Sequence, residues 1–318
     1  MGFQLFSQQV HADNANSQYQ YSVEVDDSKN TSAIQQTVKP GQQLNVKLVF
    51  ANNSNQVQTL RVNFNTAVTG DNGVIQYNFT DLTDRYFGRV NFSKLISGPK
   101  TIKLAAKAKV IQEYTIKVPK QSFSGVIAGG FYIAQADGSN QSNQQSGVNF
   151  KNVISYAIPI VLRENNRSIN TKLALNQVLA KMHYGYPTVI AKIDNLTPTM
   201  FGQMKIKTHI IDQSNNQVVF KQIQTNMNMA PLTRMSYPVV INKKLAAGDY
   251  TLKLAVSSGK AHWNFKHSFS INAKLADATA KQSKTKGSPP VWIYVVIGSV
   301  VLLGLLVSVF YLGKSKSK

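Results

Sequence analysis

The stretch from Gln42 to Val68, QQLNVKLVFANNSNQVQTLRVNFNTAV, decides the fold that the sequence predicts. Apolar residues occupy every second position on both sides of a polar segment, Asn52 to Asn55. A period of two is typical of half-buried strands, and Asn and Ser favour turns because their side chains bond to nearby backbone. The stretch therefore predicts two half-buried strands around a turn. Their alternating apolar residues are Leu44, Val46, Leu48 and Phe50, then Leu60, Val62 and Phe64.

The same alternation continues in both directions along the chain. It appears before the first turn in YQYSVEV (residues 19–25), and after it at residues 102–104 and 114–118, then in FYIAQA (131–136). Turn signals separate these segments about every ten residues, which favours an antiparallel β-sandwich over a βαβ fold. The least strand-like stretch, Leu82 to Ile96, is expected to hold a helical turn. Gly129-Gly130 indicates close packing of strands and not a phosphate-binding loop.

A polar segment, DGSNQSNQQSG at residues 137–147, indicates either a long hairpin loop or a domain boundary. A second series of alternating segments begins with ISYAIPIVLRE and ends with WNFKHSFSI. The predicted fold class is all-β, with two tandem immunoglobulin-like β-sandwich domains over residues 19–140 and 148–272 and one C-terminal transmembrane helix. Residues 273–290, which are basic and end in Pro289-Pro290, are expected to form a linker or stalk.

The predicted transmembrane helix is Val291 to Leu312, which has no charged residue in 22 positions. At 1.5 Å per residue it is about 33 Å long, enough to cross a bilayer core. The alternative, a buried helix of a soluble domain, would usually have a polar stripe. Residues 313–318 would form a basic cytoplasmic tail. The expected membrane-interface anchors are Trp292, Tyr294, Tyr311, Lys314, Lys316 and Lys318.

Residues 1–18 carry a possible export signal. Val10-His11-Ala12 resembles a cleavage site with small residues, although only a fragment of an apolar segment precedes it. This predicts a residual signal peptide, the alternative being an ordinary disordered N-terminus. Together with the basic C-terminal tail it predicts a single-pass plasma-membrane protein whose large N-terminal part is extracellular.

The charge and the cysteine content narrow the class of protein. The chain has 35 Lys and Arg residues against 14 Asp and Glu, a formal charge of +21, and no cysteine. An extracellular chain without disulfides favours a bacterial surface, Gram-positive by preference. Its positive charge attracts polyanions, and for an exported chain an anionic wall polymer or glycan is a better candidate than nucleic acid. The alternative is that the lysines only keep a β-rich surface soluble.

No pattern for catalysis or for cofactor binding appears in the sequence. The five histidines have no cysteine partners, and His262 and His267 should point to opposite faces of a strand because they are an odd number of residues apart. The acidic residues are scattered, and no nucleophile elbow, P-loop or dinucleotide fingerprint occurs. We therefore expect no enzyme activity, no cofactor and no metal site.

Eight segments in order resemble the WxL-interacting protein family of Gram-positive bacteria. This resemblance implies a peptidoglycan-binding domain followed by a host-binding domain, a C-terminal anchor, and secreted WxL-domain surface proteins as partners. One departure is Met229-Ala230-Pro231-Leu232-Thr233, where the family often has Pro-Asn-Ser after Met-Ala. The segments are TVKPGQQLNVKLVFANNS, GDNGVIQYN, VPKQSFSGVIAGGFYI, NVISYAIPIVLRE, TVIAKIDNLTP, MKIKTHIID, MAPLTRMSYPV and AAGDYTLKLAVSSGKAHWNFKHSFSI.

The binding candidates are aromatic and basic residues in loops. Their alternative roles are core or rim aromatics, solvated charges and turn residues. The expected function is a non-catalytic surface protein that binds peptidoglycan and WxL proteins or host extracellular proteins. The alternative is a general adhesin or polysaccharide-capture component that holds anionic wall polymers through its basic surface. The candidates are Tyr77, Arg85, Tyr86 and Arg89 for peptidoglycan, and His183, Tyr184 and Tyr186 for a protein partner.

Overall fold

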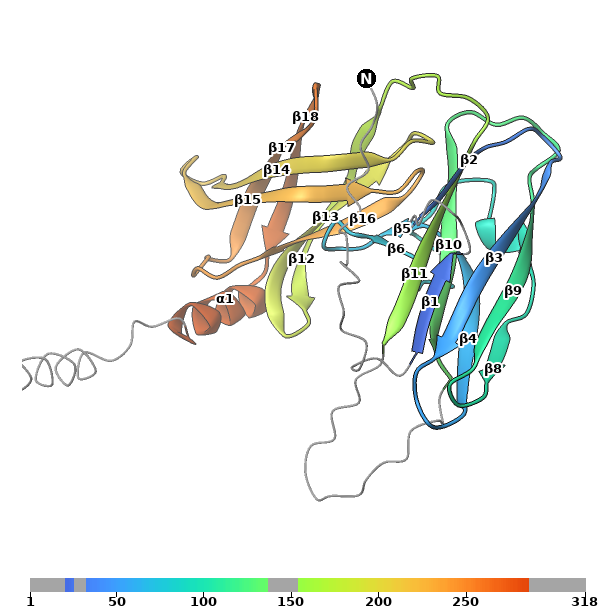
Figure 1. The fold of residues 1–318 in the computed structure, drawn as a ribbon. Helices are drawn as coiled ribbons and strands as arrows, with labels where there is room; N and C mark the ends of the chain where they lie inside the picture. Colours follow the sequence, from blue (N-terminus) through green and yellow to red (C-terminus); the bar gives the residue numbers. More distant parts are fainter. Residues whose placement is uncertain (1–20, 26–32, 137–153, 286–318) are drawn as a thin grey trace, which may run out of the picture.

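The computed structural model describes residues 21–25, 33–136 and 154–285. These residues form two β-sandwiches that lie side by side, each with its own hydrophobic core (Figure 1). The predicted all-β class is confirmed. Among the described residues no helix is long and apolar enough to cross a membrane. The predicted transmembrane segment, residues 291–312, its interface anchors and the N-terminal segment 1–18 lie outside the described residues.

The first sandwich packs a four-stranded sheet on a five-stranded sheet. Residues 42–68 supply one strand to each sheet, so their two alternating segments face each other across the core. All pairings in the two sheets are antiparallel except that of β2 with β11. In spatial order the sheets are β1 (Tyr21–Val25), β3 (Gln43–Asn52), β9 (Lys109–Lys117) and β7 (Ile96–Ser97); and β2 (Ile34–Thr37), β11 (Ser155–Arg163), β10 (Val126–Gln135), β4 (Gln58–Thr66) and β8 (Thr101–Leu104).

Three aromatic rings from three strands form the centre of the first core. Phe64, Tyr114 and Phe131 contact one another edge to face, with ring centroids 4.9–5.7 Å apart. Such pairs contribute about 0.5–1.5 kcal/mol each beyond the area that they bury. The rings come from both sheets, and they therefore hold the two layers together.

Gly129 and Gly130 let two aromatic rings approach the two faces of β10. A Cβ atom at Gly129 would lie 2.1 Å from Cγ of Phe92, and one at Gly130 would lie 2.9 Å from Cδ1 of Tyr77. Phe92 belongs to η1 (Phe92–Lys94), a single helical turn within the stretch where the sequence predicted one. Both predictions, close packing at the glycine pair and a helical turn, are confirmed.

Strand β11 belongs to the first sandwich, although the predicted boundary placed it in the second. It pairs with β10 along nine residues, from Val126–Arg163 to Ala134–Ser155. The five-stranded sheet of the first sandwich therefore includes a strand that follows the predicted boundary at residue 148. The chain passes to the second sandwich only between β11 and residue 173.

The second sandwich packs a three-stranded sheet on a four-stranded one, with antiparallel pairing throughout. Aliphatic residues, methionines and tyrosines from both sheets fill its core, among them Met204, Met229 and Tyr237. In spatial order the sheets are β12 (Leu173–His183), β13 (Tyr186–Asn195) and β16 (Arg234–Val240); and β15 (Val218–Met229), β14 (Phe201–Asp212), β17 (Gly248–Ser258) and β18 (Ala261–Ile271).

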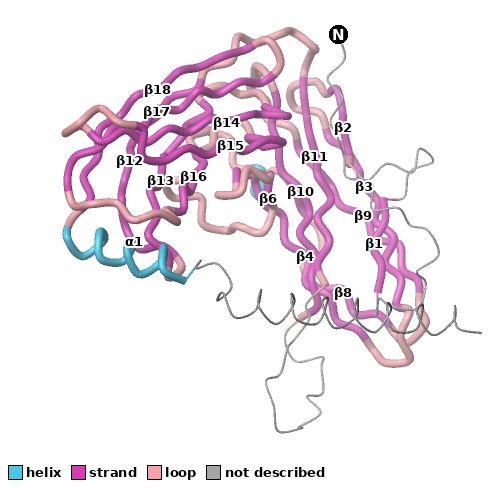
Figure 2. The backbone as a smooth tube through the Cα atoms, turned by 90° about the vertical axis from the view of Figure 1, so that its left-hand side faces the viewer, coloured by secondary structure: helices cyan, strands magenta, loops and turns pink. Residues whose placement is uncertain are grey.

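The predicted linker at residues 273–290 is wrong for its first thirteen residues, which form the helix α1 (Ala273–Thr285). Asn272 caps the helix, since its Oδ1 accepts from the Leu275 N–H at 2.9 Å. Leu275 and Thr279 are buried, and Thr279 exchanges two hydrogen bonds with the backbone of Leu245. The helix therefore packs against the second sandwich, beside β12 and β13 (Figure 2).

Candidate functional site

The β12–β13 hairpin projects an aromatic tip from the second sandwich. Its two turn residues have positive φ, 48° at Tyr184 and 81° at Gly185, the conformation of a type I′ turn. Glycine adopts this conformation freely, but a tyrosine is uncommon there because its Cβ approaches the backbone. The left-handed turn holds the Tyr184 side chain outside the sheet.

This tip is the most exposed aromatic surface in the described part of the chain. The exposed fraction is 86% for Tyr184 and 48% for Tyr186, and neighbouring Met182 is 45% exposed. The rings of His183 and Tyr184 lie against each other, with centroids 4.2 Å apart. Exposed aromatic and methionine side chains are enriched at protein interfaces. The three residues that the sequence indicated for a protein partner thus lie together and accessible.

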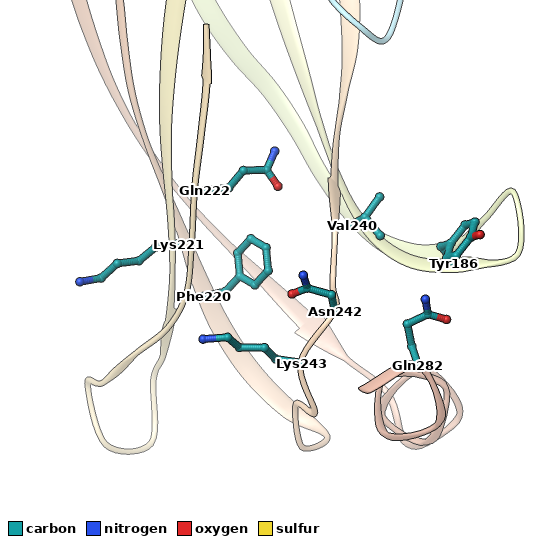
Figure 3. Close-up of a pocket in the computed structure, with 8 residues that line it drawn as sticks. All are labelled: Tyr186, Phe220, Lys221, Gln222, Val240, Asn242, Lys243 and Gln282. Carbon is teal, nitrogen blue, oxygen red and sulfur yellow. The ribbon is translucent and has the colours of Figure 1, made fainter. Parts of the chain in front are cut away.

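A hollow of about 520 Å³ adjoins the hairpin (Figure 3). It lies between β15 and β16, the edge strands where the two sheets of the second sandwich separate, and α1 closes its lower end. The Phe220 ring points into it, and the Lys221 side chain points away. Its lining residues are Tyr186, Phe220, Lys221, Gln222, Val240, Asn242, Lys243 and Gln282.

The lining chemistry of the hollow suits recognition of a partner's side chain. It combines apolar contact surface with amide donors and acceptors and with lysines, and no carboxylate or histidine lines it. Gln222 is held in place, because its Nε2 donates to the Tyr237 hydroxyl at 3.2 Å. Nowhere in residues 21–25, 33–136 and 154–285 do three or more His, Cys, Asp or Glu side chains gather as a metal site.

The peptidoglycan candidates of the first domain do not form an exposed platform, and that prediction needs correction. Tyr77 is buried, and its carbonyl accepts from Nδ2 of Asn65 at 2.6 Å. Its ring packs with Ala67, Ala128 and Ala230, the last from the second sandwich. Burial raises the pKa of the Tyr77 hydroxyl above its usual range. A ring enclosed in this way cannot stack on a glycan.

Tyr86 and Arg85 also lie where the two sandwiches meet. The Tyr86 hydroxyl donates to the Val90 carbonyl at 2.7 Å, and burial raises its pKa to about 12. The Tyr86 backbone forms a β-bridge with Thr233. Arg85 stacks over the Phe79 ring at 4.2 Å, and its carbonyl accepts from the Arg234 N–H at 2.9 Å. Of the four candidates only Arg89 is exposed.

We call this contact between the sandwiches the joint: residues 67–90 with β5 (Val68–Thr69) and β6 (Ile75–Gln76), against residues 227–234 of the second domain. Figure 1 shows β5 and β6 between the two sandwiches. At its centre the hydroxyls of Thr69 and Thr233, both fully buried, lie 2.6 Å apart. The Ala230 N–H donates to Thr69 Oγ1 at 3.0 Å. No periodicity or motif in the sequence indicated that these distant segments meet.

Sequence reasoning also missed Tyr132, on the outer face of the five-stranded sheet. It is half-buried and lies opposite Asn63 of β4, next to the pair of Ala134 with Arg61. An aromatic ring beside an amide and a guanidinium on an open sheet is chemistry suited to a sugar. Only the β4–β10 register places these side chains together.

The chain matches two family models. Residues 14–135 match the peptidoglycan binding domain of the WxL Interacting Protein, and residues 145–281 match its host binding domain. No curated protein matches the sequence. The hollow and the aromatic hairpin lie in the second of these domains, and the outer face with Tyr132 lies in the first.

Several solved structures overlap weakly with the fold. The class 5 fimbriae chaperone CfaA is 12% identical, with a TM-score of 0.33, covering 77% of this chain and 98% of its own. The YadV chaperone is 9% identical with a TM-score of 0.33, covering 80% and 100%. The PapD-like domain 7 of human CEP192 is 10% identical with a TM-score of 0.29, covering 47% and 87%. Overlaps of this size carry no conclusion. The two family models together span most of the chain, and the protein belongs to the WxL-interacting protein family.

Proposed function

We propose that this protein is a non-catalytic adaptor of the cell surface, anchored in the membrane by residues 291–312. Its first domain binds peptidoglycan, and its second binds a WxL-domain surface protein or a host extracellular protein. The surface-binding role follows from the family, whose two domains are a peptidoglycan binding domain and a host binding domain. The partners and the anchor are the proposed part.

The observation that carries the proposal is the exposed aromatic hairpin beside the hollow. Burying Tyr184, Tyr186 and Met182 would remove a large apolar area from water, and at about 25 cal/mol per Å² this area drives association. The hollow beside Tyr186 offers a place for a side chain of the partner, with Gln222 already held to hydrogen-bond it. A rigid anchor next to a pocket is the usual arrangement of an interface hot spot.

Replacing both tyrosines, Tyr184→Ser with Tyr186→Ser, should weaken binding of a purified secreted WxL protein by roughly thirtyfold to hundredfold. Hot-spot aromatics contribute about 2 kcal/mol each, and their effects are not fully additive. The measurement is a titration by biolayer interferometry with the full-length protein. Ile111→Ala, at an exposed apolar residue of β9 in the first domain, is the matched control and should leave the affinity within twofold.

Unchanged affinity in a folded double variant would exclude the hairpin as the WxL-binding surface. The same titration with a host extracellular matrix preparation separates the two partner classes. Loss of WxL binding alone assigns the hairpin to the WxL protein, and loss of matrix binding alone assigns it to the host.

For the first domain we propose that the outer face around Tyr132 contacts peptidoglycan, in place of Tyr77 and Tyr86. The Tyr132 ring can cover the apolar face of a sugar, while Asn63 and Arg61 lie in register beside it to bond hydroxyl and acyl groups. The next residue of β10 on the same face is Gly130, and the joint covers it because Tyr77 lies over it. Tyr132 packs against the cluster around Tyr77 on one side and is half-buried, so the available platform extends from its exposed part towards Asn63 and Arg61.

Tyr132→Ala combined with Asn63→Ala should reduce sedimentation of the full-length protein with insoluble peptidoglycan about tenfold, the equivalent of about 1.4 kcal/mol. This loss should persist at high salt, because uncharged contacts are not screened. The Tyr184→Ser, Tyr186→Ser variant is the control and should sediment normally. Normal sedimentation of a folded Tyr132 variant would refute this surface.

A further inference from the structure

The outer face of the four-stranded sheet in the second domain carries a row of basic side chains. Lys221 of β15 lies opposite His209 of β14, His209 opposite Lys253 of β17, and Lys253 opposite Lys266 of β18. One row thus crosses all four strands. With strands about 4.8 Å apart the row is about 14 Å wide. Three of these four side chains are lysines, and the fourth is His209. Neighbours in the row therefore do not form ion pairs with each other.

The two adjacent rows extend this basic face. Lys207 lies two residues from His209 on β14, and Lys205 lies two residues further. Residues two apart on a strand are about 7 Å apart on the same face. Across the three rows no carboxylate occurs, and none of the lysines forms an ion pair with a described residue. The basic face consists of Lys205, Lys207, Lys221, Lys253 and Lys266, with His209 and His262 among them.

Among the residues that alternate onto the same face of β17, the nearest acidic one is Asp249, two rows beyond Lys253 at one end of the strand. Its Oδ1 already accepts a hydrogen bond from Ser270 Oγ at 2.5 Å. It therefore marks the edge of the basic face and does not neutralise it.

Keeping an edge strand from pairing does not account for this arrangement. Lysines on edge strands prevent pairing between sheets, and Lys221 and Lys266 on β15 and β18 serve that purpose. Lys205, Lys207 and Lys253 lie on β14 and β17, the two central strands, which have no free edge. Like charges directly opposite each other, as with Lys253 and Lys266, destabilise a sheet. The fold thus tolerates a repulsion between lysines that is not needed to keep the protein soluble.

We propose that this basic face binds a linear polyanion with a phosphodiester backbone, a polymer of the cell wall. The cations are lysines without any arginine, which suits diffuse attraction to a chain of phosphates and not the bidentate capture of one carboxylate. The rows offer charges at intervals of about 5 and 7 Å, so an extended chain meets several at once. This inference rests on the proposed function only in placing the protein at the wall.

The basic face and the protein-binding hairpin are separate surfaces. Lys221 is the one residue that they share: it lines the edge of the hollow, but in Figure 3 its side chain points away, and the other lysines of the basic face do not line the hollow. The polymer and the protein partner can therefore be bound at the same time, and either site can fail without the other.

The test uses purified full-length protein and poly(glycerol phosphate) as the probe, without peptidoglycan or a protein partner. Lys207→Gln, Lys253→Gln and Lys266→Gln are combined in one variant. The matched control combines Lys103→Gln, Lys109→Gln and Lys117→Gln, three exposed lysines on strands of the first sandwich. Both variants lose the same charge, so only the position differs. Affinity is measured by titration at a series of salt concentrations.

We expect the first variant to lose about tenfold or more in affinity at low salt and to show a shallower decrease with salt, because fewer counterions are released. The control variant should stay within threefold. The thermal midpoint of the first variant should equal or exceed that of the unmodified protein, because its substitutions remove the repulsion across β17 and β18. Equal losses of affinity in both variants would mean that only the net charge of the protein matters, and this result would overturn the proposal. Binding of polyglutamate as tight as that of the phosphodiester polymer would also overturn it, in favour of an acidic protein.

Discussion

Arg234→Ala should lower the free energy of unfolding by about 3–5 kcal/mol, the usual result of leaving one member of a buried ion pair alone. The guanidinium is bidentate on Asp194, with Nε to Oδ1 at 2.7 Å and Nη2 to Oδ2 at 2.8 Å. The exposed fractions of the two side chains are 12% and 5%. Without Arg234 the Asp194 carboxylate keeps its burial and loses its partner.

The loss should extend beyond the second domain, because Arg234 also reaches the joint. Its Nη1 lies 3.7 Å from Oδ1 of Asp84, and its guanidinium lies 5.0 Å from the centre of the Phe87 ring. Both residues belong to the first domain's side of the joint. We therefore expect the variant to show more protease cleavage between the domains as well as a lower denaturation midpoint.

Chemical denaturation of the full-length protein measures the effect, with Arg89→Ala as control at an exposed arginine of the same joint segment. The control should change stability by less than about 0.5 kcal/mol. Replacing both partners, Arg234→Met with Asp194→Leu, should recover most of the loss, since no unpaired charge remains. A loss below 1 kcal/mol in Arg234→Ala would show that water reaches Asp194 and that the pair is not buried.

Gly129→Ala should destabilise the first sandwich by about 3 kcal/mol, at the upper end for an overpacked core. The added Cβ would lie 2.1 Å from Cγ of Phe92 and 2.7 Å from the Asn65 carbonyl oxygen. Phe92 is fully buried, and the Asn65 carbonyl belongs to the neighbouring strand β4. Neither atom can move without shifting a sheet or a helical turn.

The matched control is Gly202→Ala, also a glycine within a strand. Its Cβ would lie no closer than 3.4 Å to any neighbour, at Oδ1 of Asn228, and its φ is in the ordinary range. Thermal melting should place this variant within a few degrees of the unmodified protein. Combining Gly129→Ala with Phe92→Ala should cost less than the two changes added separately, since the alanine methyl then enters the space the ring has left. Additive losses would mean that the two residues are not in contact.

The strands of this protein could be predicted because alternation is a local signal. Leu60, Val62 and Phe64 are buried on β4, as their spacing requires. The close packing at the glycine pair in β10 could also be predicted, because a glycine inside a strand indicates that another group approaches closely, even when that group is unknown. Neither prediction depends on which strands become neighbours.

The errors all concern contacts between segments far apart in the chain. Strand β11 resembles any other buried strand, and its pairing with β10 across the polar segment 137–147 is not encoded in its own pattern. The residues of α1 are small and polar, so they resemble a linker, and their helix is held mainly by Leu275 and Thr279 against the sandwich. Tyr77 and Tyr86 had the composition of a glycan site but lie in the joint.

By itself the sequence determined the all-β class, most of the strands, the basic charge and the resemblance to a family of surface-binding proteins, because each depends on composition or on neighbours along the chain. Only the tertiary structure decided which strands pair, and with that the joint, the hollow beside Tyr186 and the row of three lysines and one histidine across four strands. The physical reason is that strand register places side chains from distant segments on one face, and the energy that selects the register is spread over the whole core.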